Sequence, residues 1–273
     1  MQTNNETNDC RIQENTVLDA DGIERPKDTT AHQLKMPSGK KKLKFTKKKH
    51  ILSLNPLWRF CCGCFIYIVG ILILLPFAKL KYGFKVENKK ALKRIKGKGA
   101  IMVGNHCHML DVLFYRLATA SRRNFLTSIP ENFTIPFLRI FVKLAGTIPI
   151  PRVVVGLRLF NEVVHDRLEN KNIVTFLPEG SMWPLYRDLR PFKKGAFRYA
   201  VRENIAVMPS CVSAKIIHKK NGKKKYKFTL TFFEPLYPLS SVSEFEAVTD
   251  LIERCSSSMR ERIVSERKKD KFC

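Results

Sequence analysis

A histidine and an aspartate five residues apart, His106 and Asp111, are the side chains of this 273-residue chain best suited to acid–base chemistry. A carboxylate beside an imidazole can accept a hydrogen bond from one ring nitrogen and leave the other free to take a proton. The apolar run 100–103 predicts a buried strand before them, and residues 109–122 predict a helix after them. α/β folds commonly place reacting groups in such a loop. On spacing alone, a purely structural role for His106 stays open.

Two further polar loops follow predicted strands. Residues 146–152 end in Arg152, whose guanidinium suits bidentate contact with a phosphate. The apolar run 173–177 is followed by Glu179 and Gly180, where exposed backbone N–H groups can surround an oxyanion. We expect these strand ends to converge with His106 at one edge of a sheet. Such a site could move an acyl group onto a phosphorylated acceptor.

The fold class follows from the alternation of strand-like and helix-like segments after residue 83. Repeated βα units predict an α/β domain over residues 83–273, with a mainly parallel sheet flanked by helices. Asn221 and Gly222 predict a hairpin between strands 211–218 and 224–233. Ser243 and Glu246 form a capping box that opens a last helix ending near residue 268.

The N-terminal part of the chain divides into two segments. Residues 1–50 predict a disordered polar tail that ends in a lysine-rich run. Residues 51–82 predict a membrane anchor, because 60–78 carry no charged side chain and are just long enough to span a bilayer. Trp58 and Arg59 on one side and Lys79 and Lys81 on the other are placed as interfacial anchors. Gly70 and Pro76 leave a half-inserted segment open, and the basic flanks do not choose an orientation.

The net charge of +26 indicates a polyanionic partner, either nucleic acid or an anionic membrane. The apolar segment favours the membrane, and no aromatic-basic recognition motif supports nucleic acid. Lysines gather at the tip of the predicted hairpin, where they either protect a sheet edge or contact a membrane or a cofactor phosphate. The eight cysteines do not form a secreted disulfide framework, so we expect reduced thiols facing the cytoplasm.

Four segments together resemble, in order, the four blocks of the glycerolipid acyltransferases, and most closely the 1-acyl-glycerol-3-phosphate acyltransferases. They are Asn105-His106-x4-Asp111, Gly146–Arg152, Phe176–Ser181 and Ile205–Pro209. The resemblance covers residues 80–240. It implies transfer of an acyl chain from acyl-CoA or acyl carrier protein, as substrate rather than cofactor, to the hydroxyl of a lysophospholipid at a membrane surface.

The resemblance also implies roles for individual residues. His106 would be the general base and Asp111 its partner. Substrate binding would fall to Asn105, Arg152, Glu179, Gly180 and Ser181, with no metal. The chain departs from the family pattern at His108, often a serine, and at Ser181-Met182, where Thr-Arg is common. The missing arginine removes a phosphate contact, for which Arg187, Lys193 or Lys194 could substitute, so the headgroup stays open.

Two alternatives at the site carry little weight. A metal held by His106 and His108 lacks further ligands in the sequence, and Cys107 is not needed as a nucleophile because a thioester donor is already activated. Other readings of the whole chain are an acyltransferase for another headgroup and a non-catalytic lipid-binding protein tethered to the membrane. We expect the site on the cytoplasmic face of a bacterial plasma membrane or of the endoplasmic reticulum.

Overall fold

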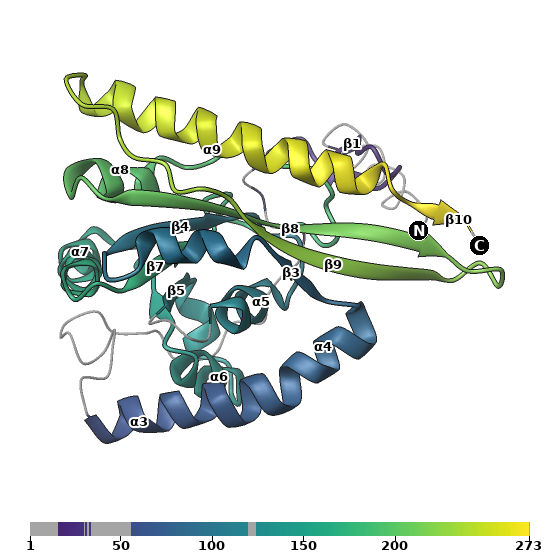
Figure 1. The fold of residues 1–273 in the computed structure, drawn as a ribbon, viewed down its shortest axis with the longest axis horizontal. Coiled ribbons are helices and arrows are strands. Elements are labelled where there is room, and N and C mark those ends of the chain that lie inside the picture. The colour runs from purple at the N-terminus through teal and green to yellow at the C-terminus, as the bar shows by residue number, and fades with distance from the viewer. Residues whose placement is uncertain (1–15, 30, 32, 34–55, 120–123, 273) are drawn as a thin grey trace, which may run out of the picture.

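The computed structural model describes residues 16–29, 31, 33, 56–119 and 124–272. Figure 1 shows a central sheet with helices on both sides. The strands of the sheet are β3 (Lys85–Glu87), β4 (Ala100–Gly104), β5 (Asn124–Ser128), β6 (Ile148–Pro149), β7 (Ile173–Phe176), β8 (Ala206–His218), β9 (Lys224–Phe232) and β10 (Lys271–Phe272). The helices around it are α3 (Pro56–Cys64), α4 (Leu75–Tyr82), α5 (Asp111–Ala118), α6 (Leu138–Leu144), α7 (Val154–Glu169), α8 (Gly195–Arg202) and α9 (Glu244–Arg267).

The sheet has the order β3-β9-β8-β4-β7-β5-β6, with β10 beside β8. All neighbouring pairs are parallel except the β8–β9 hairpin. The prediction of a mainly parallel α/β sheet is therefore confirmed. Because β4, β7, β5 and β6 run in one direction, the loops that follow them all leave from the same edge of the sheet.

Side chains of β4 alternate between two hydrophobic cores. Ile101 and Val103 pack with α7, α8 and α9 on one face. Ala100 and Met102 pack on the other face with residues of α4 and α5. Burial on both faces explains why this strand reads as a continuous apolar run.

A continuous helix runs from Pro56 to Tyr82 and contains a π-helical stretch, η1 (Phe65–Leu74), between α3 and α4. The N–H of Leu75 donates to the Gly70 carbonyl five residues back. Pro76 explains the wider turn, because it has no N–H and its ring would meet the carbonyl of Leu72 in a regular α-helix. Residues Phe60–Tyr82 are long and apolar enough to cross a membrane.

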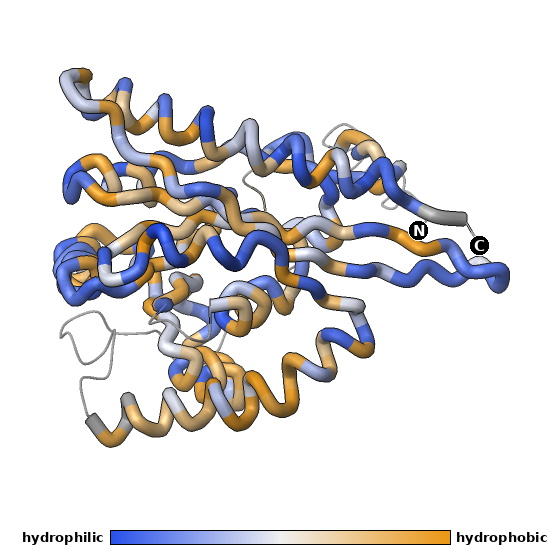
Figure 2. The backbone as a smooth tube through the Cα atoms, viewed as in Figure 1, coloured by the Kyte–Doolittle hydropathy of each residue, from blue (hydrophilic) through white to orange (hydrophobic). Residues whose placement is uncertain are grey.

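One side of this helix rests on the domain. Gly70 lies close to Leu117 of α5, and the rings of Phe65 and Phe141 meet edge to face. The opposite side exposes Leu57, Phe60, Leu72, Ile73 and Leu80. Figure 2 shows this helix as an apolar band along one side of the molecule. The predicted residues Trp58 and Arg59 have side chains outside the described set.

The C-terminal half follows the predicted elements with one change. The capping box of Ser243 and Glu246 is present at the start of α9. The predicted hairpin forms, with His218 opposite Lys224. The first hairpin strand was expected over residues 211–218, whereas β8 begins at Ala206 and runs through Pro209. The Pro209 carbonyl accepts the N–H of Phe233, which keeps the chain extended there.

The prediction of disorder over residues 1–50 is wrong for part of that range. Short antiparallel strands β1 (Thr16–Leu18) and β2 (Glu24–Pro26) form a hairpin that packs on the domain. Its central side chain is Arg25, which is only 1 % exposed. Polar contacts, rather than an apolar face, hold this segment, so hydrophobic periodicity did not indicate it. The lysine-rich run at 40–49 and the expected boundary at residue 50 lie outside the described residues.

Candidate active site

The loop after β4 brings His106 and Asp111 together. His106 Nδ1 lies 3.1 Å from Asp111 Oδ2, and the same oxygen accepts the N–H groups of Cys107 and His108, each at 2.7 Å. A carboxylate only accepts hydrogen bonds, so this contact assigns the proton to Nδ1 and leaves Nε2 bare. Asp111 is fully buried, whereas the His106 side chain is 23 % exposed. A buried carboxylate thus holds a partly exposed base in one orientation.

Asn105 anchors this loop to the sheet. Its side-chain amide donates to the Val212 carbonyl at 2.9 Å and accepts the Val212 N–H at 2.8 Å. The hydroxyl of Tyr115 donates to the same side-chain oxygen. Asn105 is 1 % exposed. The amide therefore joins the loop that carries His106 to β8, and its expected contact with a substrate stays a prediction.

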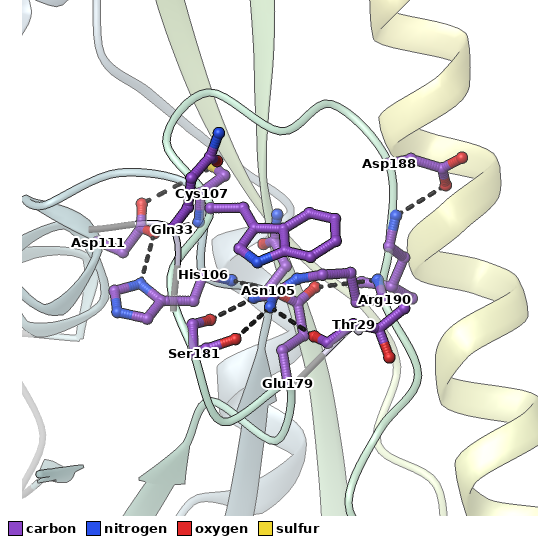
Figure 3. Close-up of polar contacts among 12 residues, drawn as sticks. Thr29, Gln33, Asn105, His106, Cys107, Asp111, Glu179, Ser181, Asp188 and Arg190 are labelled. Atoms are coloured by element: carbon purple, nitrogen blue, oxygen red, sulfur yellow. Dashed lines mark hydrogen bonds and ion pairs between the residues drawn. The ribbon is translucent and has the colours of Figure 1, made fainter. Parts of the chain in front are cut away.

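The loop after β7 meets the His106 loop directly. Glu179 Oε2 accepts the His106 N–H at 3.3 Å and the Arg190 guanidinium at 2.6 Å. Arg190 also donates to the hydroxyl and the carbonyl of Ser181. Figure 3 shows Arg190 turned toward Glu179 and Ser181, with His106 and Asp111 beside them. Burial raises the pKa of Glu179, and the Arg190 charge partly offsets that rise.

The contacts of Arg190 involve two residues of the third family block, Phe176–Ser181. The carboxylate of Glu179 and the hydroxyl of Ser181 are buried and bonded to Arg190, so they hold the loop instead of facing an acceptor. Gly180 is the exposed residue of the three, with φ at 75°. Arg190 is the site residue that sequence reasoning missed. No spacing pattern indicated it, because it closes a long irregular loop.

Arg152 lies apart from the other predicted residues. It follows β6, three strands from β4, which is about 14 Å at the usual strand spacing. Its side chain is 63 % exposed and pairs with Glu131. The structure therefore brings His106, Asp111 and Glu179 together and leaves Arg152 at the same edge, farther along the sheet.

The three basic residues proposed to replace the missing arginine lie in different surroundings. Arg187 is buried and paired with Asp21 and Asp270. Lys194 Nζ lies 4.1 Å from the centre of the Phe245 ring. Lys193 alone reaches the site loop: its Nζ would be 2.6 Å from a Cβ on Gly180. Met182, at the position of the family arginine, is itself buried.

The two residues that follow His106 differ from it in environment. His108 packs against the rings of Tyr82, Phe114 and Phe228, and burial lowers its pKa. Its Nδ1 accepts the N–H of Leu110. Burial raises the pKa of the Cys107 thiol well above its usual value, which disfavours a thiolate nucleophile. Among the described residues, no group of three or more His, Cys, Asp and Glu is placed to hold a metal ion.

The N-terminal segment covers the far side of the loop after β7. Arg25 donates to the Pro184 carbonyl at 3.0 Å, and the indole N–H of Trp183 donates to the Ala31 carbonyl at 2.8 Å. Arg190 adds a bond to the Thr29 carbonyl. The segment 16–33 therefore supports the same loop that carries Glu179.

Comparison with known proteins finds similarity to acyltransferases. The family model "Acyltransferase" matches residues 83–213, which include His106, Asp111, Arg152 and Glu179. An uncharacterized acyltransferase of Schizosaccharomyces pombe is 26 % identical over 191 residues, covering 68 % of this chain and 67 % of that protein. The crystal structure of the 1-acyl-sn-glycerophosphate acyltransferase of Thermotoga maritima is similar with a TM-score of 0.46 and 19 % identity, covering 78 % of this chain and 82 % of that one. The family match covers residues 83–213, just under half of the chain.

Proposed function

We propose that this acyltransferase domain transfers an acyl chain from an acyl thioester to the free hydroxyl of a lysophospholipid, with 1-acyl-glycerol-3-phosphate as the preferred acceptor. The observation that carries the proposal is the pair of His106 and Asp111, which points a bare, partly exposed imidazole nitrogen away from a buried carboxylate. The product would be phosphatidic acid, an intermediate of phospholipid biosynthesis. The donor is acyl-CoA or acyl carrier protein.

The chemical step uses His106 twice. Nε2 takes the proton of the acceptor hydroxyl while the oxygen attacks the thioester carbonyl, and Asp111 stabilises the imidazolium that results. When the carbon–sulfur bond breaks, the imidazolium returns the proton to the departing thiolate. The ester bond has formed, the thioester bond has broken, and the histidine is neutral again. Asn105 and Glu179 keep the loop in place during this cycle through Val212 and the His106 N–H.

Lys193 is the residue we assign to the acceptor phosphate. Its ammonium lies over Gly180, directly after the glutamate that contacts the His106 backbone. A lysine at this point supplies the charge that Met182 lacks. Arg152 lies farther along the same edge, and its exposed side chain is free to turn inward only if it leaves Glu131.

The apolar helix supports a membrane setting for this reaction. A lysophospholipid is itself part of a bilayer, so a site beside a helix that could cross the membrane would meet its acceptor there. We assign the site to the cytoplasmic face, of either a bacterial plasma membrane or the endoplasmic reticulum, where thioester donors are made available.

A product assay tests the proposal. The full chain in vesicles is given acyl-CoA or acyl carrier protein and a panel of lysophospholipids, and products are identified by mass spectrometry. We expect phosphatidic acid to dominate and His106→Ala to lower the rate by about 10²–10⁴-fold, as for loss of a general base. Full activity of His106→Ala in folded, membrane-bound protein would refute the mechanism. Acceptor binding without any product would favour the non-catalytic alternative.

The neighbouring lysines provide a matched pair for the headgroup. We expect Lys193→Ala to raise KM for the phosphate-bearing acceptor by about tenfold, the usual scale for one charged hydrogen bond. Lys194→Ala removes the same charge one residue away, on the side that faces Phe245, and should leave KM within about twofold. If both substitutions raise KM equally, or if an acceptor with another headgroup gives a higher rate, Lys193 does not bind the acceptor phosphate.

A further inference from the structure

The end of the β8–β9 hairpin extends beyond β4, and β10 pairs with it at Ile217 and His218. The pairing of β4 with β8 ends at Ser210, whereas β8 and β9 stay paired to His218 and Lys224. Figure 1 shows the hairpin projecting past the body of the domain. Its lysines are Lys215, Lys219, Lys220, Lys223, Lys224, Lys225 and Lys227.

Among the described residues, these lysines form no ion pair with an acidic side chain. No Asp or Glu occurs between residues 215 and 227. Two acidic residues of neighbouring elements pair with arginines instead, since Asp270 pairs with Arg187 and Glu87 pairs with Arg262. Within the part of the chain that the structure describes, the hairpin therefore holds a block of positive charge without an ion-pair partner.

The same hairpin is joined to the end of the apolar helix. Gly83 ends α4 with φ at 54° and turns the chain into β3, which pairs with β9. The side chain of Lys227 lies on this turn, with its Cγ 3.1 Å from the position of a Cβ on Gly83. Lys79 and Lys81 lie in the last turn of α4. Positive charge thus starts on the helix at its C-terminal end and continues onto the hairpin.

Figure 2 shows how the two kinds of surface meet. The helix from α3 to α4 is mostly apolar up to its last turn, and the tip of the hairpin is hydrophilic. An apolar segment followed by clustered lysines is the arrangement that places charges at the level of lipid headgroups. This holds whether the helix crosses the bilayer or lies in its surface, because both cases leave the residues after Tyr82 at the interface.

We propose that the β8–β9 hairpin is a second membrane contact, which binds the anionic headgroups of the bilayer that holds the α3–α4 helix. The helix attaches the protein by an apolar contact that salt does not weaken. The hairpin adds an electrostatic contact that acts within about 8–10 Å and falls with ionic strength. Two contacts at separate points fix the tilt of the domain. The inference depends on the membrane setting but not on acyl transfer.

A competition between vesicles tests the hairpin contact. The full chain is offered phosphatidylcholine vesicles and vesicles of phosphatidylcholine with phosphatidylglycerol, and the two are separated by flotation. Each lysine at an anionic surface changes partition by about fivefold. We expect the variant with Lys219, Lys220, Lys223 and Lys224 changed to Gln to lose about 10²–10³-fold in preference for the anionic vesicles at low salt. Wild type should lose most of its preference at high salt.

A matched variant removes the same charge elsewhere. In this variant four basic residues are changed to Gln: Arg158, Lys171, Arg198 and Arg202. They lie on or next to α7 and α8, at the other end of the sheet from the hairpin (Figure 1). This variant should keep the preference within about fivefold. Equal losses in the two variants would overturn the proposal in favour of a net-charge effect.

A second measurement needs no substitution. Hydrogen exchange of residues 219–224 in the wild-type chain should slow on anionic vesicles and not on neutral ones. Unchanged exchange on both would overturn the proposal. So would salt-sensitive binding of RNA or DNA that the hairpin variant loses while its vesicle preference stays, because this outcome would assign the lysines to a nucleic acid. Acyl transfer is measured separately, so an inactive protein that still passes these tests refutes only the proposed function.

Discussion

The loop Pro178–Lys194 and the β8–β9 hairpin are both rich in positive charge, but they use it in opposite ways. In the loop, Arg187 and Arg190 are buried and each is paired with a carboxylate. In the hairpin, the lysines lie largely exposed and away from acidic groups. A buried charge is tolerated only when a partner compensates it, so the loop charges fix internal geometry. The exposed charges of the hairpin contribute little to the fold and are available to an external partner.

The largest expected effect comes from breaking the buried pair. Arg190→Ala leaves the buried Glu179 carboxyl without its guanidinium partner, and should lower the free energy of unfolding by about 3–5 kcal/mol. Denaturant unfolding in detergent measures this. Lys224→Gln in the hairpin is the control and should change the free energy of unfolding by less than about 0.5 kcal/mol. Similar effects of both substitutions would remove the distinction between the two regions.

A smaller effect is expected from the N-terminal side of the loop. Arg25→Ala removes the contacts to Asp19, Gln33 and the Pro184 carbonyl, and should cost about 2–3 kcal/mol. Limited proteolysis should then cut the segment 16–33 at Lys27 earlier than in wild type. If stability and cleavage stay unchanged, the segment does not support the loop, and its charges resemble those of the hairpin.

The smallest effect is a dependence on pH. Burial raises the pKa of Asp19, but hydrogen bonds from the Ile23 N–H, Arg25 and the Asp21 N–H outweigh it, so the folded pKa lies below the ordinary value. The resulting stabilisation is complete above the unfolded pKa of about 3.9 and disappears as pH falls through the folded pKa. Wild type should therefore lose more stability than Asp19→Asn as the pH falls from about 5 toward about 3. Parallel pH profiles would contradict this.

The parts of the fold that sequence predicts are those set by local patterns. The strand before His106 is an apolar run buried on both faces, and Ser243 with Glu246 marks the start of α9 within one turn. His106 and Asp111 could be paired in advance because a strand, a tight loop and a helix place residues five apart within reach of each other.

The parts that sequence did not predict depend on polar contacts between distant residues. Arg190 reaches Glu179 across an irregular loop, and Arg25 reaches Pro184 across most of the chain. The resemblance implied that Asn105 binds substrate. Its contact with Val212 was not predicted, because nothing near Asn105 in sequence indicates that partner. Periodicity describes apolar faces, so a segment held by ion pairs reads like a disordered one.

Because Cys107 is buried, the reaction rate of its thiol can be used to measure opening of the loop that carries His106. Its thiol is 2 % exposed and lies 3.7 Å from the Val212 carbonyl and 4.0 Å from Asp111 Oδ1, between the two histidines. An alkylating reagent can reach this sulfur only when the loop leaves β8. The rate of Cys107 alkylation therefore reports how often the loop that carries His106 opens.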